Sequence, residues 1–99
     1  MPSANAPSAA AAATESRALA DRYDDLAKRI DALKLTSDEL LPRAQRYQKL
    51  AREAAAALRD VAQAVEQGDA TKARNRRIEF DDLARAEGPL VAEINRVCR

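Results

Sequence analysis

The only cysteine of the sequence, Cys98, is the first side chain to consider for chemistry, because a thiolate is a strong nucleophile. Arg96 and Arg99 lie beside it, and neighbouring cations favour the thiolate. Cys98 lies one residue from the end of the sequence, where we expect too few elements to surround a substrate. We therefore predict a small apolar residue that closes the last helical turn. An intermolecular disulfide or a reactive thiol is the alternative.

Composition disfavours catalysis and metal binding by the other residues. The sequence contains no histidine, which removes the commonest general base and the commonest metal ligand. Two clusters of carboxylates are present: Asp21, Asp24 and Asp25, and Glu79, Asp81 and Asp82. A di-iron site in a helical bundle would need a Glu-x-x-His motif, which the sequence lacks. We interpret both clusters as solvated faces, and we expect a protein that is not an enzyme and binds no metal, haem or other cofactor.

Four cations lie close together in the last third of the chain: Lys72, Arg74, Arg76 and Arg77. We expect them in the first two turns of a helix, where the helix dipole disfavours positive charge. One interpretation is local pairing, of Arg76 with Glu79 and of Arg77 with Asp81. The other is a docking patch for an acidic protein partner or for a phosphate backbone.

The overall charge argues against nucleic acid as the partner. Lysine and arginine number 17 and aspartate and glutamate number 16, which gives a formal net charge of +1. Nucleic-acid-binding domains usually carry a large positive excess. The basic stretch also lacks interleaved aromatic side chains that would stack on bases. A protein partner is therefore favoured over RNA or DNA.

The elements that would position these residues are helices. The sequence has only two glycines and four prolines and is rich in alanine, leucine, arginine and glutamate, which favours an all-α fold. The central part of the chain has apolar or aromatic residues at alternating steps of four and three. These positions are Leu40, Ala44, Tyr47, Ala51, Ala54, Leu58, Val61 and Val65. Such a seam predicts coiled-coil-like packing against neighbouring helices.

A second seam with the same spacing precedes it, at Leu19, Tyr23, Leu26, Ile30 and Leu33. It predicts a helix that starts at about Thr14, with Thr14 as the N-cap. Tyr23 and Tyr47 both lie in the middle of a seam. We expect them to pack within the bundle with their hydroxyl groups at its edge. If the helices open or dimerise, the two tyrosines would instead anchor an interface.

Two short connections separate the predicted helices. Thr36 and Glu39 form a capping box ahead of the central helix, with Ser37 as the competing N-cap. Gly68 and Asp69 predict a tight reversal, because glycine adopts the left-handed conformation readily and aspartate caps a following helix. The central and last helices must therefore be antiparallel neighbours.

The last helix has a wide apolar stripe, which suits a helix that touches two others. Arg76, Arg77 and Glu87 interrupt this stripe. Pro89, which follows Gly88, has no backbone N–H to donate to the preceding turn. We therefore predict a kink or brief break there, with Pro89 starting a last short helix.

The expected architecture is an antiparallel three-helix bundle over residues 14–99, with helices over about 14–35, 38–67 and 70–98. Residues 1–13 are rich in alanine, proline and serine and predict a disordered arm. The alternative for its five-alanine run is a frayed first turn of the following helix. The sequence has no apolar run of membrane-spanning length and no signal-peptide pattern at its start, so we expect a cytoplasmic protein. If Met1 replaces a removed leader, the protein would be secreted or periplasmic.

These features together predict a non-catalytic protein–protein interaction or adaptor module, which acts through exposed helix faces and can self-associate. The candidate partner-binding residues are Lys72, Arg74, Arg76, Arg77, Tyr23 and Tyr47. Two alternatives remain: a nucleic-acid-binding helical protein that uses the basic start of the last helix, and a secreted or periplasmic structural protein.

Overall fold

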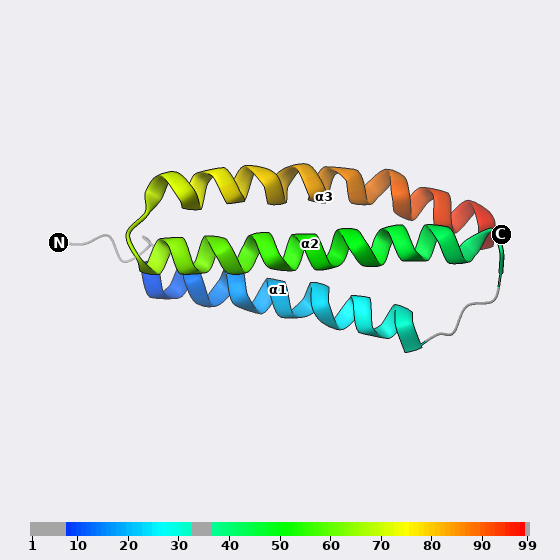
Figure 1. Cartoon of the computed structure of the whole chain (residues 1–99), viewed down its shortest axis with the longest axis horizontal. Coiled ribbons are helices and arrows are strands. Elements are labelled where there is room, and N and C mark those ends of the chain that lie inside the picture. Colours follow the sequence, from blue (N-terminus) through cyan, green and yellow to red (C-terminus); the bar gives the residue numbers. More distant parts are fainter. Residues whose placement is uncertain (1–7, 33–36, 99) are drawn as a thin grey trace.

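The computed structural model describes residues 8–32 and 37–98, which form three α-helices (Figure 1). They are α1 (Ala9–Ala32), α2 (Leu40–Glu66) and α3 (Ala70–Cys98). Each helix runs antiparallel to the one before it, and α2 packs against both of the others. The dimensions are 57 × 23 × 22 Å, so the protein is a rod. The predicted antiparallel three-helix bundle is confirmed.

The start of α1 differs from the prediction, because Ser8 caps the helix instead of Thr14. The Ser8 Oγ accepts a hydrogen bond from the Ala11 N–H at 3.0 Å. Alanine has the highest helix propensity, so the alanine run continues from this cap as helix. Placing residues 9–13 in a disordered arm was therefore wrong. The rest of the predicted arm, residues 1–7, lies outside the described residues.

The competing N-cap, Ser37, precedes α2. Its Oγ accepts a hydrogen bond from the Leu40 N–H at 3.1 Å, and its carbonyl accepts one from the Leu41 N–H at 2.9 Å. The predicted capping box with Thr36 lies partly outside the described residues, as does the predicted end of the first helix near residue 35.

The reversal between α2 and α3 is confirmed. Gly68 has a φ of 73°, in the left-handed region. The Asp69 N–H donates to the Ala64 carbonyl at 2.9 Å and the Gly68 N–H to the Val65 carbonyl at 3.2 Å, which is the Schellman arrangement. The Asp69 Oδ1 then accepts from the Lys72 N–H at 3.0 Å and caps α3.

α3 continues through Gly88 and Pro89 as one helix, so the predicted separate last helix does not form. Pro89 and Arg85 are both exposed, and water can satisfy the Arg85 carbonyl that loses its N–H donor. The C-terminal part of α3 inclines toward α2 (Figure 1).

The closest packing is between α1 and α2, and alanine makes it. Ala13, Ala20 and Ala27 recur at every seventh residue of α1 and are at most 1% exposed. Ala20 packs in a cluster with Ala54 and Ala55 of α2. The buried face of α1 is therefore this alanine stripe, whereas the predicted seam residues from Leu19 to Ile30 are only half-buried.

The half-buried seam of α1 fills the space between α1 and α3. These two helices come no closer than 8 Å between Cα atoms of the described residues. Long side chains bridge the gap, because Leu26 and Ile30 of α1 pack on the same cluster as Leu90, Val91 and Ile94 of α3. The bundle thus has one tight side and one wide side.

A larger residue in the alanine stripe should separate α1 from α2. We expect Ala20→Leu, at a fully buried position, to lower the free energy of unfolding by about 1–3 kcal/mol, measured by urea denaturation. Ala18→Leu is the matched control, because Ala18 is exposed on the same helix, and it should change stability by less than about 0.5 kcal/mol. Equal stabilities of the two variants would contradict the alanine-mediated contact.

Candidate functional site

Three helices meet at one carboxylate in the middle of the bundle. Glu87 of α3 accepts a hydrogen bond from the Tyr47 hydroxyl of α2 at 2.7 Å. Its other oxygen accepts from the Tyr23 hydroxyl of α1 at 3.3 Å. Glu87 interrupts the apolar stripe of α3 in the sequence, and the two hydroxyl donors explain how a carboxylate is accommodated there.

The aromatic rings complete this junction. The rings of Tyr23 and Phe80 meet edge to face, with centroids 5.9 Å apart and planes at 75°. Tyr47 is 8% exposed, and Phe80 is 7% exposed. The tyrosines therefore pack within the bundle, as the first interpretation predicted. Their use as interface anchors remains a prediction.

Burial raises the pKa of Tyr23 and of Tyr47, and the adjacent Glu87 carboxylate raises the pKa of each further. Both effects disfavour the negatively charged phenolate. The junction therefore favours both tyrosine hydroxyl groups in the protonated state.

An apolar hollow lies between α1 and α3, toward the Gly68 end of the rod. Its volume is about 450 Å³. Leu58, Val61 and Val65 of α2 line it. The side chains from the flanking helices are Ala12, Glu15, Ser16 and Leu19 of α1 and Ala73 and Arg77 of α3. We call this the α1/α3 hollow. It exists because the small side chains of Ala12, Ser16 and Ala73 do not span the wide side of the bundle.

The four predicted partner-binding cations have different surroundings. Arg76 pairs with Asp60 of α2 at 2.7 Å and with Glu79. Arg77 pairs with Asp81 at 3.3 Å and lies over the Phe80 ring, 5.6 Å from its centroid. The predicted local pairs are therefore present, and Arg76 in addition bonds across to α2. The use of these cations in docking remains a prediction.

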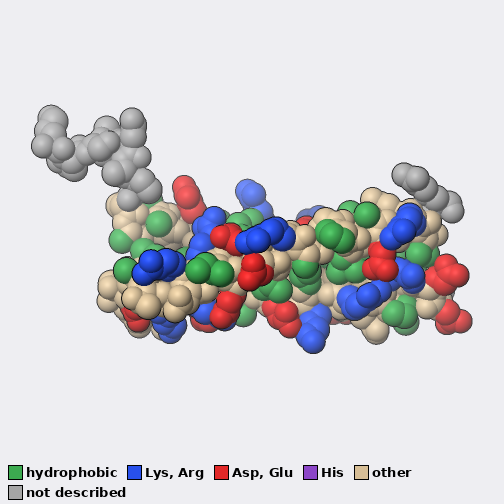
Figure 2. Space-filling model, turned by 90° about the horizontal axis from the view of Figure 1, so that it is seen from above, with side chains coloured by type: hydrophobic (Ala, Val, Ile, Leu, Met, Phe, Trp, Pro, Cys, Tyr) green, Lys and Arg blue, Asp and Glu red, His purple; other side chains and the backbone are tan. Residues whose placement is uncertain are grey.

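Lys72 and Arg74 are exposed, and neither forms an ion pair with a described residue. On the face that looks onto α3, acidic and basic side chains are interspersed along the rod, with hydrophobic side chains between them (Figure 2). The cations do not form one continuous patch on this face.

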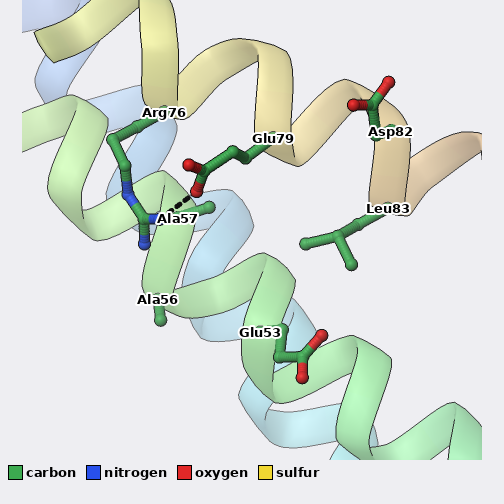
Figure 3. A pocket seen from close by; sticks show the side chains of 7 residues that line it. All are labelled: Glu53, Ala56, Ala57, Arg76, Glu79, Asp82 and Leu83. Carbon is green, nitrogen blue, oxygen red and sulfur yellow. Dashed lines mark hydrogen bonds and ion pairs between the residues drawn. The ribbon is translucent and has the colours of Figure 1, made fainter.

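A second surface feature runs between α2 and α3. One end is a hollow of about 390 Å³, lined by Ala56, Ala57, Leu83, Glu53, Glu79 and Asp82 together with Arg76 (Figure 3). Figure 3 shows Leu83 pointing between the two helices and Arg76 reaching across to α2. Three of the four charged side chains at this end are carboxylates.

The other end is a hollow of about 530 Å³, lined by Leu50, Ala86, Pro89, Leu90, Arg46, Glu93 and Arg96. Leu50 and Ala57 are seven residues apart on α2, as are Leu83 and Leu90 on α3. Both hollows therefore lie on the same side of this helix pair. None of the described residues of α1 lines either one. We call the two hollows together the α2/α3 groove.

The carboxylate clusters are used in ion pairs. Asp21 and Asp24 both pair with Arg59 of α2. Asp82 pairs with Arg85 at 3.2 Å. Among the residues that the structure describes, no group of three or more cysteines and carboxylates is placed to hold a metal ion.

The backbone of Cys98 ends α3, but its side chain lies outside the described part of the structure, so the thiol prediction is untested. In the described ranges, 8–32 and 37–98, no helix is long and apolar enough to cross a membrane.

Comparison with known proteins adds no relative. No protein-family model, curated protein or solved structure matches the chain. The class that the structure defines is a three-helix bundle with a polar junction at its centre and, on different sides, the α1/α3 hollow and the α2/α3 groove.

Three contributors to these features were missed from the sequence. The seven-residue alanine spacing in α1 is visible in the sequence, but the leucine seam of the same helix predicts a different buried face. Glu87 was noticed only as an interruption, although two tyrosines at matching heights were its natural donors. Asp60, the partner of Arg76, lies on another helix, and local spacing gives no signal for it.

The tyrosine junction should make the protein sensitive to alkali. Well below the ordinary phenol pKa of about 10, the phenols are neutral in the folded and unfolded states, so the stability is fully present. At a pH above that value the unfolded state loses the phenolic protons first, because the folded pKa values are raised, and stability falls as pH rises. Urea unfolding between pH 8 and about 11.5 measures this fall.

The control is the double variant Tyr23→Phe/Tyr47→Phe, which has no phenol at the junction. Its stability should fall less steeply over the same range, because the two proteins differ only in the phenols. Parallel curves for the two proteins would rule out the junction as the source.

Proposed function

We propose that this protein is a non-catalytic protein-interaction module, and that the α1/α3 hollow is its docking surface. The observation that carries the proposal is an open hollow whose lining includes the half-buried apolar side chains of Leu19 and Val65, above the buried Leu58 and Val61. Apolar side chains at the base of an open hollow gain stability when a partner covers them. An amphipathic helix is the partner element that fits, because it presents apolar residues along one face.

The charges around the hollow favour an acidic partner helix. Arg77 lines the hollow, and Lys72 and Arg74 are the neighbours of the lining residue Ala73. Carboxylates beside the partner's apolar stripe would find these cations at the rim, which favours encounter and orientation more than affinity. The sequence-based partner-binding residues Lys72, Arg74 and Arg77 thus fall beside this surface.

Filling the hollow should abolish docking without unfolding the bundle. Ala73→Leu adds a side chain at the edge of the hollow, where space exists, so stability should change by less than about 1 kcal/mol. The test is quantitative mass spectrometry of proteins captured from the source cells by the wild-type protein and by this variant. At least one protein should be enriched by the wild type and lost, roughly tenfold or more, with Ala73→Leu.

The matched control is Ala92→Leu, an exposed position on the same helix outside the hollow. This variant should capture the same protein as the wild type. The proposal fails if the same proteins are captured by all three, or if purified candidates bind wild type and Ala73→Leu with equal affinity.

The cations beside the hollow, Lys72 and Arg74, give a second prediction, which tests whether the partner is acidic. Lys72→Glu/Arg74→Glu should weaken the captured complex, and the difference from wild type should shrink as salt is raised. Both positions are exposed, so folding should be unaffected. A complex that is equally strong with both variants would exclude an electrostatic contribution of the rim.

The same variant addresses the nucleic-acid alternative. Lys72 and Arg74 are exposed and pair with no described carboxylate, whereas Arg76 and the exposed Arg77 both pair with carboxylates. Nucleic-acid binding through this region would appear at low salt, fall steeply with added salt and disappear in the variant. That result would replace the protein partner with a phosphate backbone.

A further inference from the structure

The α2/α3 groove combines apolar and small residues. Leu50 of α2 and Leu83 and Leu90 of α3 line it, and the latter two are half-buried. Ala56 and Ala86 are exposed within it. Small residues at exposed positions allow a neighbouring helix to approach closely, and the leucines supply the apolar surface that it would cover.

The charges of the groove are separated by sign along its length. Glu53, Glu79 and Asp82 line one end together with Arg76, so the lining there has three carboxylates and one cation. The three carboxylates are 51%, 55% and 65% exposed and pair with Lys49, Arg76 and Arg85. At the other end Arg46 and Arg96 line the groove with Glu93. The lining of this end therefore has two cations and one carboxylate, the opposite excess to the first end.

The charges along the groove match those of a second groove that runs in the opposite direction. If a second copy lies on the groove with its helices antiparallel to the first, the acidic end of each copy faces the basic end of the other. A two-fold axis across the rod produces this arrangement, and two-fold interfaces are the commonest among homo-oligomers. A parallel arrangement would instead place like charges together.

We propose that the α2/α3 groove is the interface of a two-fold homodimer, in which the second copy of this chain lies antiparallel on the first. Ala86 lies about midway between the two ends of the groove on α3, so the axis passes close to it. The two copies of Ala86 therefore approach each other, and the leucines on either side pack across the axis. The α2/α3 pair of one copy then stacks on the α2/α3 pair of the other, and the two layers share an apolar interior.

The dimer is independent of the docking function proposed for the α1/α3 hollow. The groove contains no residue of that hollow, and Ala73→Leu should leave dimerisation unchanged. Failure of the dimer would thus leave the docking proposal standing, and failure of docking would leave the dimer.

Charge reversal at one end at a time tests the interface. Glu79→Lys/Asp82→Lys makes both ends basic, and Arg46→Glu/Arg96→Glu makes both ends acidic. Each variant alone should dimerise roughly tenfold or more weakly than the wild type in sedimentation-equilibrium measurements, because like charges meet at both contacts. An equimolar mixture of the two variants should recover dimers, since in the mixed dimer each acidic end again faces a basic end.

The matched control is Arg22→Glu/Lys28→Glu, which changes the net charge as the second variant does but lies at exposed positions of α1. It should dimerise like the wild type. Recovery in the mixture with no loss in the control supports the interface. A wild-type protein that stays monomeric at every concentration overturns the proposal, as does a dimer that survives both groove variants.

Cross-linking tests the position of the axis. In a Cys98→Ser background, Ala86→Cys should form an intermolecular disulfide on mild oxidation, because the two copies of residue 86 approach across the axis. Ala92→Cys in the same background, exposed but outside the groove, should remain a reduced monomer under denaturing electrophoresis. Equal cross-linking at both positions would show that copies collide at random, and stronger cross-linking at residue 92 would place the dimer on another face; either result overturns the proposal.

Discussion

The close contact between α1 and α2 determines most of the remaining structure. Where α1 meets α2 it presents only a methyl group, at Ala13, Ala20 and Ala27, so the two helices can approach closely. The larger apolar side chains of α1 cannot enter that contact, and they lie on the side toward α3. There they keep α3 at a distance that leaves more than 8 Å between Cα atoms of α1 and α3. One tight side and one wide side follow from the position of the alanines alone.

Polar contacts then fix how α1 and α2 are aligned along their length. Gln48 is buried and donates to the Ala27 carbonyl at 2.8 Å. Three ion pairs repeat the seven-residue interval: Arg17–Glu66, Asp24–Arg59 and Asp31–Arg52. Each is exposed and contributes little stability by itself. Sliding α1 by seven residues, however, would bring Arg17 against Arg59 in one direction and Asp24 against Glu66 in the other. The pairs therefore exclude the neighbouring alignments, which the repeating alanine stripe alone would tolerate.

The parts of the fold that were predictable depend on contacts near in sequence. Gly68 and Asp69 reverse the chain as expected, because the required conformations and caps are local. The start of α1 was wrong because two serine or threonine caps compete, and the alanines between Ser8 and Thr14 favour helix from the earlier one. The face of α1 that packs against α2 was equally hard to predict. An alanine stripe buries less apolar area than a leucine seam, and its advantage is that it lets two helices approach closely.

In the candidate site, too, the contacts near in sequence were predictable and those between helices were not. The local pair of Arg77 with Asp81 was foreseen, and the basic start of α3 was recognised as a whole. The contacts that join helices were not, because Glu87 takes its donors from α1 and α2, and Arg76 takes Asp60 from α2. Spacing within one helix cannot indicate which side chain of another helix will lie at the same height. It can indicate only that a charge within an apolar stripe must find a partner.

Residue size gives the two surface features a common cause. Ala12 and Ser16 face Ala73 across the wide side of the bundle, and Ala56 and Ala86 lie across the outer side of α2 and α3. In both places, small residues on two neighbouring helices leave a hollow above the apolar side chains of the interior. Because the two features lie on different sides, a dimer formed through the groove leaves the α1/α3 hollow of each copy free. The antiparallel arrangement places these two α1/α3 hollows toward opposite ends of the dimer. Such a dimer would hold two partner helices at once. A partner that presents two copies of the helix would bind the dimer far more tightly than a single contact allows, provided the distance between its two helices matched the distance between the two α1/α3 hollows.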